Sequence, residues 1–591
     1  MKNTLTSFLI ISLCIIFFTN CRKDEGLTTT KNQFELPQKE VTASIMGRVL
    51  NEQGEVLENV LITLNNETTT CDRNGVFNFQ NKKINSYGAV LSFEKEGYFT
   101  VQKLVRTDEG EKAYLEVMLM QRLLTASFQA NQGATIQTLN GAKVKIPANA
   151  IQTNLGSNYN GTVSVYARWL NPTAPNLVLE MPGDLRGISE QEELVQLATY
   201  GMIGVELIGE SGEELQLNGS QKASIEMPIP TDLLANAPNT IPLWHFDEQT
   251  AHWLEEGTAS LQGNTYVGEV GHFSFWNCDF PFESVFLKGL VLNEDTGLGM
   301  PNQRIEIKID TESRVGIGFT NAAGYFSGAV PKGEVLHISV KDVFCGTTYG
   351  ITVGPFTTDP NLSVLLTIPT NGLDYLHVTG SLVDCNENPL VDGYVKIVND
   401  NNSLGSIFST DDNGNFAGDF IFCTNIPTSI SVKGIDFNAA LESEVTSYSI
   451  VTGQTDLDIS TIEVCEEFDS KFFYYQIEGG ETHFITSAFA LMTVTIPGTP
   501  PNLFVSVNGP AGTVSPYLII EDPALGINAV SNMRLVNTSN SLLVCNPCEN
   551  LVATVLEFGE ESGDLIKGSF SGTVDDNGVP VAVSGKFRVN L

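Results

Sequence analysis

Two cysteines near the C-terminal end of the chain lie close enough in sequence to act as a chemical pair. Cys545 and Cys548 form a Cys-x-x-Cys motif, a spacing that occurs in redox dithiols and in one half of many zinc sites. A redox pair sits at a helix N-terminus in a thioredoxin-like fold, and a zinc site needs a second pair of ligands. Neither context accompanies this motif, so we predict a small structural disulfide.

The other cysteines are spread along the chain, which has ten in all. Cys385, Cys423 and Cys465 fall at the start, the middle and the end of one strand-rich segment, and we expect one disulfide within it. Cys345 is a candidate partner for the third thiol. The sequence leaves the connectivity open.

An acidic turn raises the question of calcium binding. The run from Asp411 to Asn415 (DDNGN) resembles the start of a calcium loop, but Phe422 stands at the twelfth position, where such a loop has a glutamate. We therefore predict a hairpin turn. A weak Ca²⁺ site that uses Asp411, Asp412 and Asn413 stays open as the alternative, and no other cofactor is expected.

The N-terminus indicates export and lipidation. Residues 8–18 (FLIISLCIIFF) form an apolar run that is shorter than the roughly 20 residues needed to span a bilayer. The run leads into Phe18-Thr19-Asn20-Cys21, which is similar to a relaxed lipobox, and a Lys-Asp-Glu cluster follows. We expect a signal peptide over 1–20, an acylated Cys21 that anchors the chain in the outer membrane at the cell surface, and a polar tether over 21–39. An ordinary cleaved signal peptide is the alternative.

Composition limits the classes of function. The chain has 591 residues, of which 42% are hydrophobic and 17% are charged, so it can build several packed cores and is not intrinsically disordered. Its 32 basic and 69 acidic residues give a net charge of −37. A surface this acidic repels the phosphate backbone, which excludes nucleic acid as a partner.

The pattern of apolar residues predicts an all-β protein. Short runs in which apolar and polar residues alternate are separated by breaks rich in Gly, Asn and Asp, as in β-sandwiches. Residues 305–309 (IEIKI) and 394–398 (YVKIV) are examples. Only residues 189–196 and 231–237 have a local helical pattern. We expect tandem β-sandwich modules of transthyretin or immunoglobulin type.

Three segments share one pattern: each opens with a glycine in a strand and closes with a tight turn followed by an aromatic residue. The opening and closing residues are Gly47 and Asp72–Phe77, Gly289 and Asn321–Phe326, and Gly380 and Asp411–Phe416. In each turn Asp or Asn bonds its own backbone, and the aromatic returns to the core. The pattern resembles the carboxypeptidase regulatory-like domain, a transthyretin-type sandwich. The resemblance implies three such modules, over 40–121, 282–370 and 371–466.

The same resemblance raises zinc carboxypeptidase chemistry, because the regulatory-like domain is the non-catalytic companion of those enzymes. One His-x-x-Glu occurs, at His252 and Glu255, and the chain has six histidines. The surrounding residues have the pattern of two strands around a turn, and no third ligand is recognisable. We therefore predict a β-hairpin with an exposed His252 and no zinc catalysis.

Residues 122–281 form a different module. Its landmarks are Gly141–Pro147, Tyr200–Met202, Pro228–Pro230, Pro242–Trp244 and Gly271–Asn277. In this order they resemble the middle region of cartilage intermediate layer protein and of the FAM171 family and, more distantly, ZU-type domains. The resemblance implies an extracellular or scaffolding β module. The four tryptophans all lie in this region, and we expect them to pack in its core.

Some ZU-type domains cleave themselves at a His-Phe-Ser motif, and this chain has that motif at residues 272–274. The resemblance makes His272 the candidate base and Ser274 the candidate nucleophile, with the scissile bond between Phe273 and Ser274. Cleavage also needs a strained peptide, which the sequence cannot show. The alternative is a core strand in which Ser274 is inert.

The remaining segment, 467–591, is read as a further β-sandwich. No constellation of residues supports metabolic catalysis, so we expect a non-catalytic lipoprotein that binds or displays an extracellular protein or glycan through serial sandwiches. Two alternatives remain. One is a self-cleaving surface protein, and the other is an accessory glycan-binding lipoprotein.

Overall fold

The computed structural model describes residues 39–591 apart from short segments at 66, 220, 295–296, 310–313, 342–347, 361–363, 369–373, 392, 400–401, 423–428, 440, 452, 468–470, 478–480, 486–487, 494–500, 508–514, 537–541, 560–563 and 577–578. Cys345 and Cys423 lie outside the described residues, as do the signal peptide, Cys21 and the tether up to residue 38. No helix in the described part of the chain is long and apolar enough to cross a membrane.

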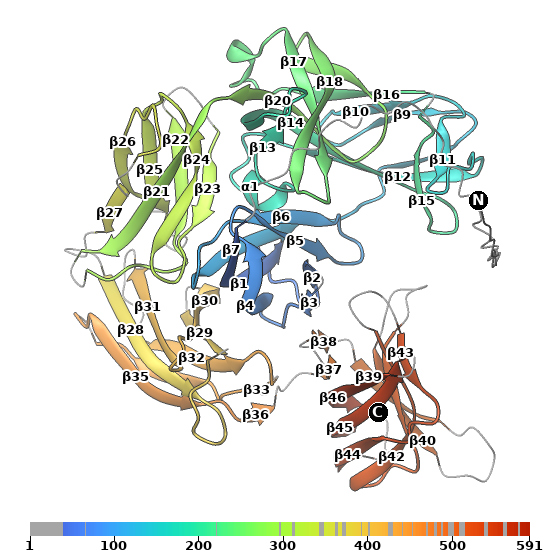
Figure 1. Cartoon of the computed structure of the whole chain (residues 1–591), viewed down its shortest axis with the longest axis vertical. Helices are drawn as coiled ribbons and strands as arrows, with labels where there is room; N and C mark the ends of the chain where they lie inside the picture. Colours follow the sequence, from blue (N-terminus) through green and yellow to red (C-terminus); the bar gives the residue numbers. More distant parts are fainter. Residues whose placement is uncertain are drawn as a thin grey trace, which may run out of the picture. The chain divides into compact units, whose positions relative to one another are not determined.

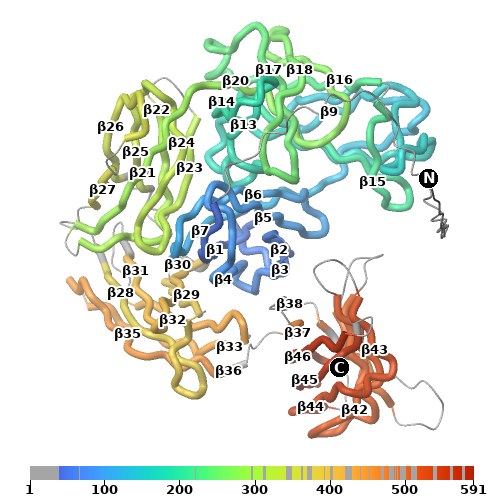
Figure 2. Tube along the Cα trace, in the orientation of Figure 1, coloured from blue at the N-terminus to red at the C-terminus, as the bar shows by residue number. Residues whose placement is uncertain are grey.

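The described chain is almost entirely β-structure, so the predicted fold class is confirmed (Figures 1 and 2). The first repeat forms two sheets, with strand orders β4-β1-β7 and β3-β2-β5-β6. In the first sheet, β1 is antiparallel to β4 and parallel to β7. The strands are β1 (Glu40–Asn51), β2 (Leu61–Leu64), β3 (Glu67–Thr70), β4 (Val76–Asn85), β5 (Ala89–Glu94), β6 (Val101–Val105) and β7 (Lys112–Leu119).

The second repeat has the same strand order, with sheets β24-β21-β27 and β23-β22-β25-β26. Its central strand β21 is again antiparallel to the strand before it in this order and parallel to the one after it. The strands are β21 (Ser284–Asn293), β22 (Arg304–Ile309), β23 (Gly316–Phe319), β24 (Tyr325–Pro331), β25 (Leu336–Lys341), β26 (Thr348–Val353) and β27 (Val364–Ile368).

The third repeat keeps the three-stranded sheet, β31-β28-β35, and extends the other sheet to β30-β29-β32-β33-β36, with β34 paired to β32. The strands are β28 (Asp374–Val383), β29 (Gly393–Asn399), β30 (Asn402–Ser409), β31 (Asn415–Phe422), β32 (Ser429–Asp436), β33 (Leu441–Glu442), β34 (Thr446–Ser449), β35 (Asp456–Glu463) and β36 (Glu466–Glu467). The shared order explains why one sequence pattern occurs three times.

The opening glycine and the closing aromatic of each repeat are cross-strand partners. Gly47 is paired with Phe77, Gly289 with Phe326 and Gly380 with Phe416. A Cβ atom on these glycines would lie 2.6, 2.1 and 2.7 Å from the Cζ atom of the paired phenylalanine. The glycine is therefore needed because the aromatic ring occupies the space that any side chain would fill.

The closing turns share one hydrogen-bond pattern. In the first repeat Oδ1 of Asp72 accepts bonds from the backbone N–H groups of Asn74 and Val76, at 2.8 and 3.0 Å. Asn321 and Asp411 make the equivalent pair of bonds in the second and third repeats. These turns position the strand that carries the phenylalanine.

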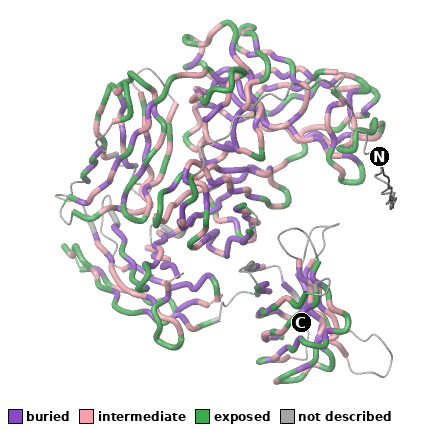
Figure 3. The backbone as a smooth tube through the Cα atoms, in the orientation of Figure 1, coloured by how far each residue is buried: buried purple, intermediate pink, exposed green. Residues whose placement is uncertain are grey.

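Residues 126–282 form a 13-stranded sheet system. Its strands are β8 (Ala126–Gln129), β9 (Ala134–Gln137), β10 (Lys143–Ile146), β11 (Ile151–Thr153), β12 (Thr162–Leu170), β13 (Arg186–Ile188), β14 (Leu194–Ile208), β15 (Glu214–Leu217), β16 (Ala223–Pro228), β17 (Thr240–Asp247), β18 (His252–Gln262), β19 (Thr265–Val270) and β20 (Phe275–Phe282). Trp244, Trp253 and Trp276 are fully buried, so their predicted core role is confirmed. Figure 3 colours the backbone by burial and shows buried residues distributed along the strands of the chain. Trp169 is half-buried.

Of the two segments predicted to be helical, one is not helical and the other contains a short 3₁₀ helix. Residues 189–196 are not helical: the backbone N–H of Ser189 donates to the carbonyl of Glu193 at 2.9 Å, which closes a turn between β13 and β14. Pairing of these strands overrides the local helical preference. Residues 231–237 contain the short 3₁₀ helix η1 (Leu234–Asn236). The one-turn helix α1 (Leu177–Glu180) was not predicted.

The C-terminal segment forms a ten-stranded sheet system of order β38-β37-β46-β45-β44-β42-β41-β40-β39, with β43 paired to β42. The strands are β37 (Phe472–Ile477), β38 (Glu481–Ile485), β39 (Ala488–Thr493), β40 (Asn502–Val507), β41 (Tyr517–Ile520), β42 (Gly526–Val536), β43 (Leu542–Cys545), β44 (Leu551–Phe558), β45 (Leu565–Asp576) and β46 (Val579–Asn590). It has a hydrophobic core of its own.

Candidate functional site

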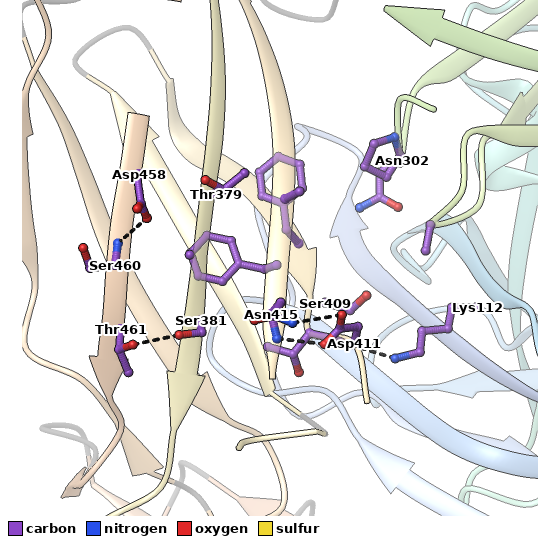
Figure 4. A pocket seen from close by; sticks show the side chains of 17 residues that line it. Lys112, Asn302, Thr379, Ser381, Ser409, Asp411, Asn415, Asp458, Ser460 and Thr461 are labelled. Atoms are coloured by element: carbon purple, nitrogen blue, oxygen red, sulfur yellow. Dashed lines mark hydrogen bonds between the residues drawn. The ribbon is translucent and has the colours of Figure 1, made fainter. Parts of the chain in front are cut away.

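The third repeat borders a groove of about 620 Å³ to which the first and second repeats also contribute (Figure 4). Its polar lining consists of hydroxyl, carboxylate, amide and ammonium groups. They belong to Lys112, Asn302, Thr379, Ser381, Ser409, Thr410, Asp411, Asn415, Asp458, Ser460 and Thr461. The apolar part of the lining includes Phe408 and Phe416, which are largely buried.

The paired strands β28 and β35 hold several of the groove's hydroxyl groups in fixed positions. The parallel pairing of β28 with β35 has an irregularity between Thr379 and Ser381, opposite Ser460, whose φ of 64° is unusual for a residue other than glycine. Next to this bulge the hydroxyl groups of Ser381 and Thr461 lie 2.9 Å apart in a hydrogen bond. A bulge of this kind re-aims side chains, here toward the groove.

The acidic turn considered as a calcium site lies at the edge of this groove. The backbone N–H groups of Asn413 and Asn415 donate to Oδ1 of Asp411, each at 2.8 Å. Burial opposes ionisation here, but these bonds outweigh it and hold the pKa of Asp411 below its usual range. Next to it, Nζ of Lys112 donates to the carbonyl of Thr410 at 2.7 Å. The carboxylate therefore already acts as a turn cap. The turn is not the predicted hairpin, because it connects β30 to β31, which lie in different sheets and pair with β29 and β28.

A second cluster lies in the 122–281 region and joins His272 to two residues that the sequence did not single out. Oε2 of Glu256 lies 3.1 Å from Nδ1 of His245 and 3.5 Å from Nε2 of His272. Within the described residues, this is the one group of three His, Cys, Asp or Glu side chains placed to share a metal ion. Burial, together with the nearby charge of His272, lowers the pKa of His245 against the opposing effect of Glu256.

The geometry at Phe273 and Ser274 differs from that of an activated nucleophile. The Ser274 hydroxyl donates to the carbonyl of Phe275 at 3.0 Å, while the His272 ring packs against Trp276, with 5.1 Å between ring centroids. Gln216 holds the peptide on both sides of Phe273, since it accepts from its N–H at 2.6 Å and donates to its carbonyl at 2.8 Å. These contacts match the alternative of an inert serine at the start of a core strand.

The His-x-x-Glu motif lies in the predicted hairpin, because Asp247 of β17 is paired with His252 of β18. The expectation of an exposed His252 is wrong: this residue is 1% exposed. Its Nδ1 lies 2.6 Å from the carbonyl oxygen of Thr250. Oε2 of Glu255 instead accepts a bond from the backbone N–H of Glu190 at 3.0 Å. The two side chains have separate partners.

Two disulfides join four of the candidate cysteines. Cys385 is bonded to Cys465 with 5.2 Å between their Cα atoms, and Cys545 to Cys548 with 4.9 Å. The first closes the third repeat on itself, from the end of β28 to the end of β35. Cys71 and Cys278 are buried free thiols, and burial raises the pKa of both.

Comparison with known proteins gives partial matches. No family model matches the chain. A stretch of 165 residues is 26% identical to human cartilage intermediate layer protein 2, and 167 residues are 23% identical to human cartilage intermediate layer protein 1. The matches span 26% and 27% of this chain and 14% of each relative. The resemblance to these proteins is thus confirmed for a part of the chain, which spans a small fraction of their length.

Two pilins are among the matching solved structures. The shaft pilin SpaA of Lactobacillus rhamnosus GG matches 32% of this chain and 98% of its own, at 13% identity and a TM-score of 0.15. BcpA, the major pilin subunit of Bacillus cereus, matches 73% of this chain and 100% of its own, at 8% identity and a TM-score of 0.12. TM-scores this low carry no argument about fold or function.

Proposed function

We propose that this chain is a non-catalytic surface protein that binds an extracellular ligand through the groove of the third repeat. The observation that carries the proposal is the groove itself, which is lined by hydroxyl and charged groups from strands and turns and is apolar in part. Binding sites commonly combine apolar lining with a few placed polar groups. Sugars present hydroxyl groups that such a lining can bond, so a glycan is the ligand class we would test first.

The absence of a nucleophile next to a free base within the described lining supports a binding role over catalysis. Ser381 and Thr461 bond each other. Asp458 accepts the backbone N–H of Ser460 at 2.8 Å, and the Asp411 carboxylate caps its turn. Their neighbours hold these groups in place, which favours binding of a ligand over chemical conversion of a substrate.

A glycan array followed by titration calorimetry tests the proposal. We expect hits with the wild-type chain and, for the double variant Ser381→Ala/Thr461→Ala, a loss of affinity of at least about tenfold, since two lining hydroxyls at about 1 kcal/mol each are removed. Thr258→Ala is the matched control, because Thr258 is an exposed threonine of β18 that does not line the groove. An array without hits, or a double variant that binds as the wild type does, would contradict a glycan groove.

We also propose that Cys21 is acylated and holds the protein at the outer face of the outer membrane. The support is the apolar run that ends at this cysteine and the Lys-Asp-Glu cluster that follows it. Two or more acyl chains anchor a protein stably. The wild-type chain should partition into the detergent phase of a cloud-point separation, whereas Cys21→Ser should stay in the aqueous phase. Protease treatment of intact cells then distinguishes a surface location from a periplasmic one.

A further inference from the structure

Three side chains from different segments of the 122–281 region converge on one point. His245 lies in β17 and Glu256 in β18, whereas His272 precedes β20. The strand β17 is paired with both β18 and β20, and His245 is directly opposite Trp276. The Trp276 indole N–H donates to the carbonyl of His272 at 3.0 Å. The rings of His245 and His272 are 4.7 Å apart and both pack against Trp276. The cluster is thus built on a rigid, buried tryptophan.

The separations among the three side chains suit a shared metal ion. A tetrahedral zinc ion binds nitrogen and oxygen ligands at about 2.0–2.2 Å, which places neighbouring ligand atoms about 3.3 Å from each other. The two measured separations, 3.1 Å for His245 and 3.5 Å for His272 from Oε2 of Glu256, lie on either side of that value. All three ligand atoms lie within 4.8 Å of one another.

The closer of the two contacts is not a well-formed hydrogen bond. Nδ1 of His245 is buried, and its 3.1 Å contact with Oε2 of Glu256 does not have hydrogen-bond geometry. A buried ring nitrogen without a well-aligned bond is costly. A metal ion between the nitrogen and the carboxylate oxygen would satisfy both atoms.

We infer that His245, Glu256 and His272 form a binding site for a divalent transition-metal ion, with Zn²⁺ as the expected occupant. Imidazole nitrogen is a suitable ligand for zinc, copper, iron and nickel, whereas Ca²⁺ takes six to eight oxygen ligands. The side chains are 19%, 47% and 34% exposed, respectively. A fourth position therefore faces water. Because the ligands come from three segments, the ion would also tie β17, β18 and the start of β20 together.

Zinc binding to the purified, untagged full chain tests this inference. The chain is kept under non-reducing conditions, so that Cys545 and Cys548 stay joined, then dialysed against Zn²⁺ and analysed by mass spectrometry of the bound metal. We expect one zinc ion per chain. Glu256→Gln and His272→Gln should each weaken zinc binding by more than about tenfold. Co²⁺ should give the visible absorption of a four- or five-coordinate ion with nitrogen ligands, and this absorption should be lost in the same variants.

The controls separate loss of the site from loss of the fold. Glu256 and His272 are partly exposed, so their variants should keep the wild-type circular dichroism spectrum and melting temperature without metal. His337→Gln removes a histidine of β25 outside the cluster and should bind zinc as the wild type does. A wild-type chain that binds no zinc would overturn the inference, and so would cluster variants that retain it with unchanged affinity.

Discussion

The hydroxyl of Tyr394 donates a hydrogen bond to the carboxylate of Asp72, although the two residues lie 322 positions apart. Both are buried. Asp72 caps the closing turn of the first repeat, and Tyr394 lies in β29 of the third. Nδ2 of Asn74 donates to the same hydroxyl at 2.8 Å, and Nζ of Lys396 donates to Oδ1 of Asn74, also at 2.8 Å. The two repeats therefore share a buried polar network.

Removing this hydroxyl should weaken the contact between the repeats. Tyr394→Phe leaves the buried Asp72 carboxylate without one of its donors, and we expect a loss of about 1–3 kcal/mol in the free energy of unfolding. Burial already raises the pKa of Asp72, and the bond from Tyr394 opposes that rise, so the variant should raise it further. Chemical denaturation of the full chain measures the loss. Tyr325→Phe, at an exposed tyrosine of the second repeat, should change little, and equal effects of the two substitutions would contradict the prediction.

A substitution at Gly289 tests whether the ring of Phe326 requires a glycine in the opposite strand. Gly289→Ala would place a Cβ 2.1 Å from the Phe326 ring, so the ring must leave its position. Overpacking of this kind costs about 1–3 kcal/mol. Gly328 lies in the partner strand β24 of the same ladder, and a Cβ there would meet nothing within 4 Å. Thermal unfolding should therefore show a lower melting temperature for Gly289→Ala and an unchanged one for Gly328→Ala. A shared response would mean that the glycine serves another purpose.

The sequence could predict this local architecture because its signals are local. A turn that bonds its own backbone needs only Asp411 and the residues up to Asn415, and strand alternation needs a few residues more. The contact between the first and third repeats includes the bond from Tyr394 to Asp72, and the sequence around either residue does not predict the other. Residues 189–196 are the opposite case. Their local pattern predicts a helix, but the pairing of β13 with β14 overrides that preference.

The two disulfides should differ in their effect on stability. Cys385 and Cys465 are separated by 80 positions, Cys545 and Cys548 by 3. A crosslink that closes a longer loop removes more entropy from the unfolded chain, which predicts about 4 kcal/mol for the first and about 2 kcal/mol for the second. Denaturation of Cys385→Ala/Cys465→Ala and of Cys545→Ala/Cys548→Ala would compare them. A larger effect of the short loop would contradict the entropic account.

A histidine of the third repeat should make stability depend on pH. His377 is paired with Asp419 on one side and with Asp456 on the other. The hydrogen bond of Nδ1 to Oδ1 of Asp419, at 2.7 Å, raises the His377 pKa above its ordinary value of 6.5 although burial opposes the rise. A pKa that is higher in the folded state stabilises the protein fully below pH 6.5, and this contribution is lost as pH rises through the folded-state pKa.

Asp419→Asn removes that contribution and should flatten the curve. Melting temperatures between about pH 6 and pH 9 should fall for the wild type more steeply than for the variant, because the variant lacks the charge that favours protonated His377. Buried carboxyl groups with raised pKa values, such as Asp72 and Asp279, are common to both proteins and cancel in the difference. Parallel curves would show that His377 titrates alike with and without Asp419.

The candidate metal cluster could not be predicted from sequence motifs. The His-Phe-Ser motif drew attention to His272 through its neighbour Ser274, and the His-x-x-Glu motif drew attention to His252. The structure instead joins His272 to His245 and Glu256, which no short motif connects. Only the registers of β17 with β18 and β20 bring them together.

The contacts of Ser274 predict that the chain does not cleave itself. Attack on the Phe273 carbonyl would require the Ser274 hydroxyl to leave the Phe275 carbonyl, and the His272 ring to turn away from Trp276. We expect one band near the full mass on denaturing electrophoresis, for the wild type and for Ser274→Ala alike. Two fragments that meet at residue 273, present in the wild type and absent in the variant, would contradict this and establish self-processing. Gln216→Ala adds a control, because it frees the Phe273 peptide from its two bonds without touching either candidate catalytic side chain.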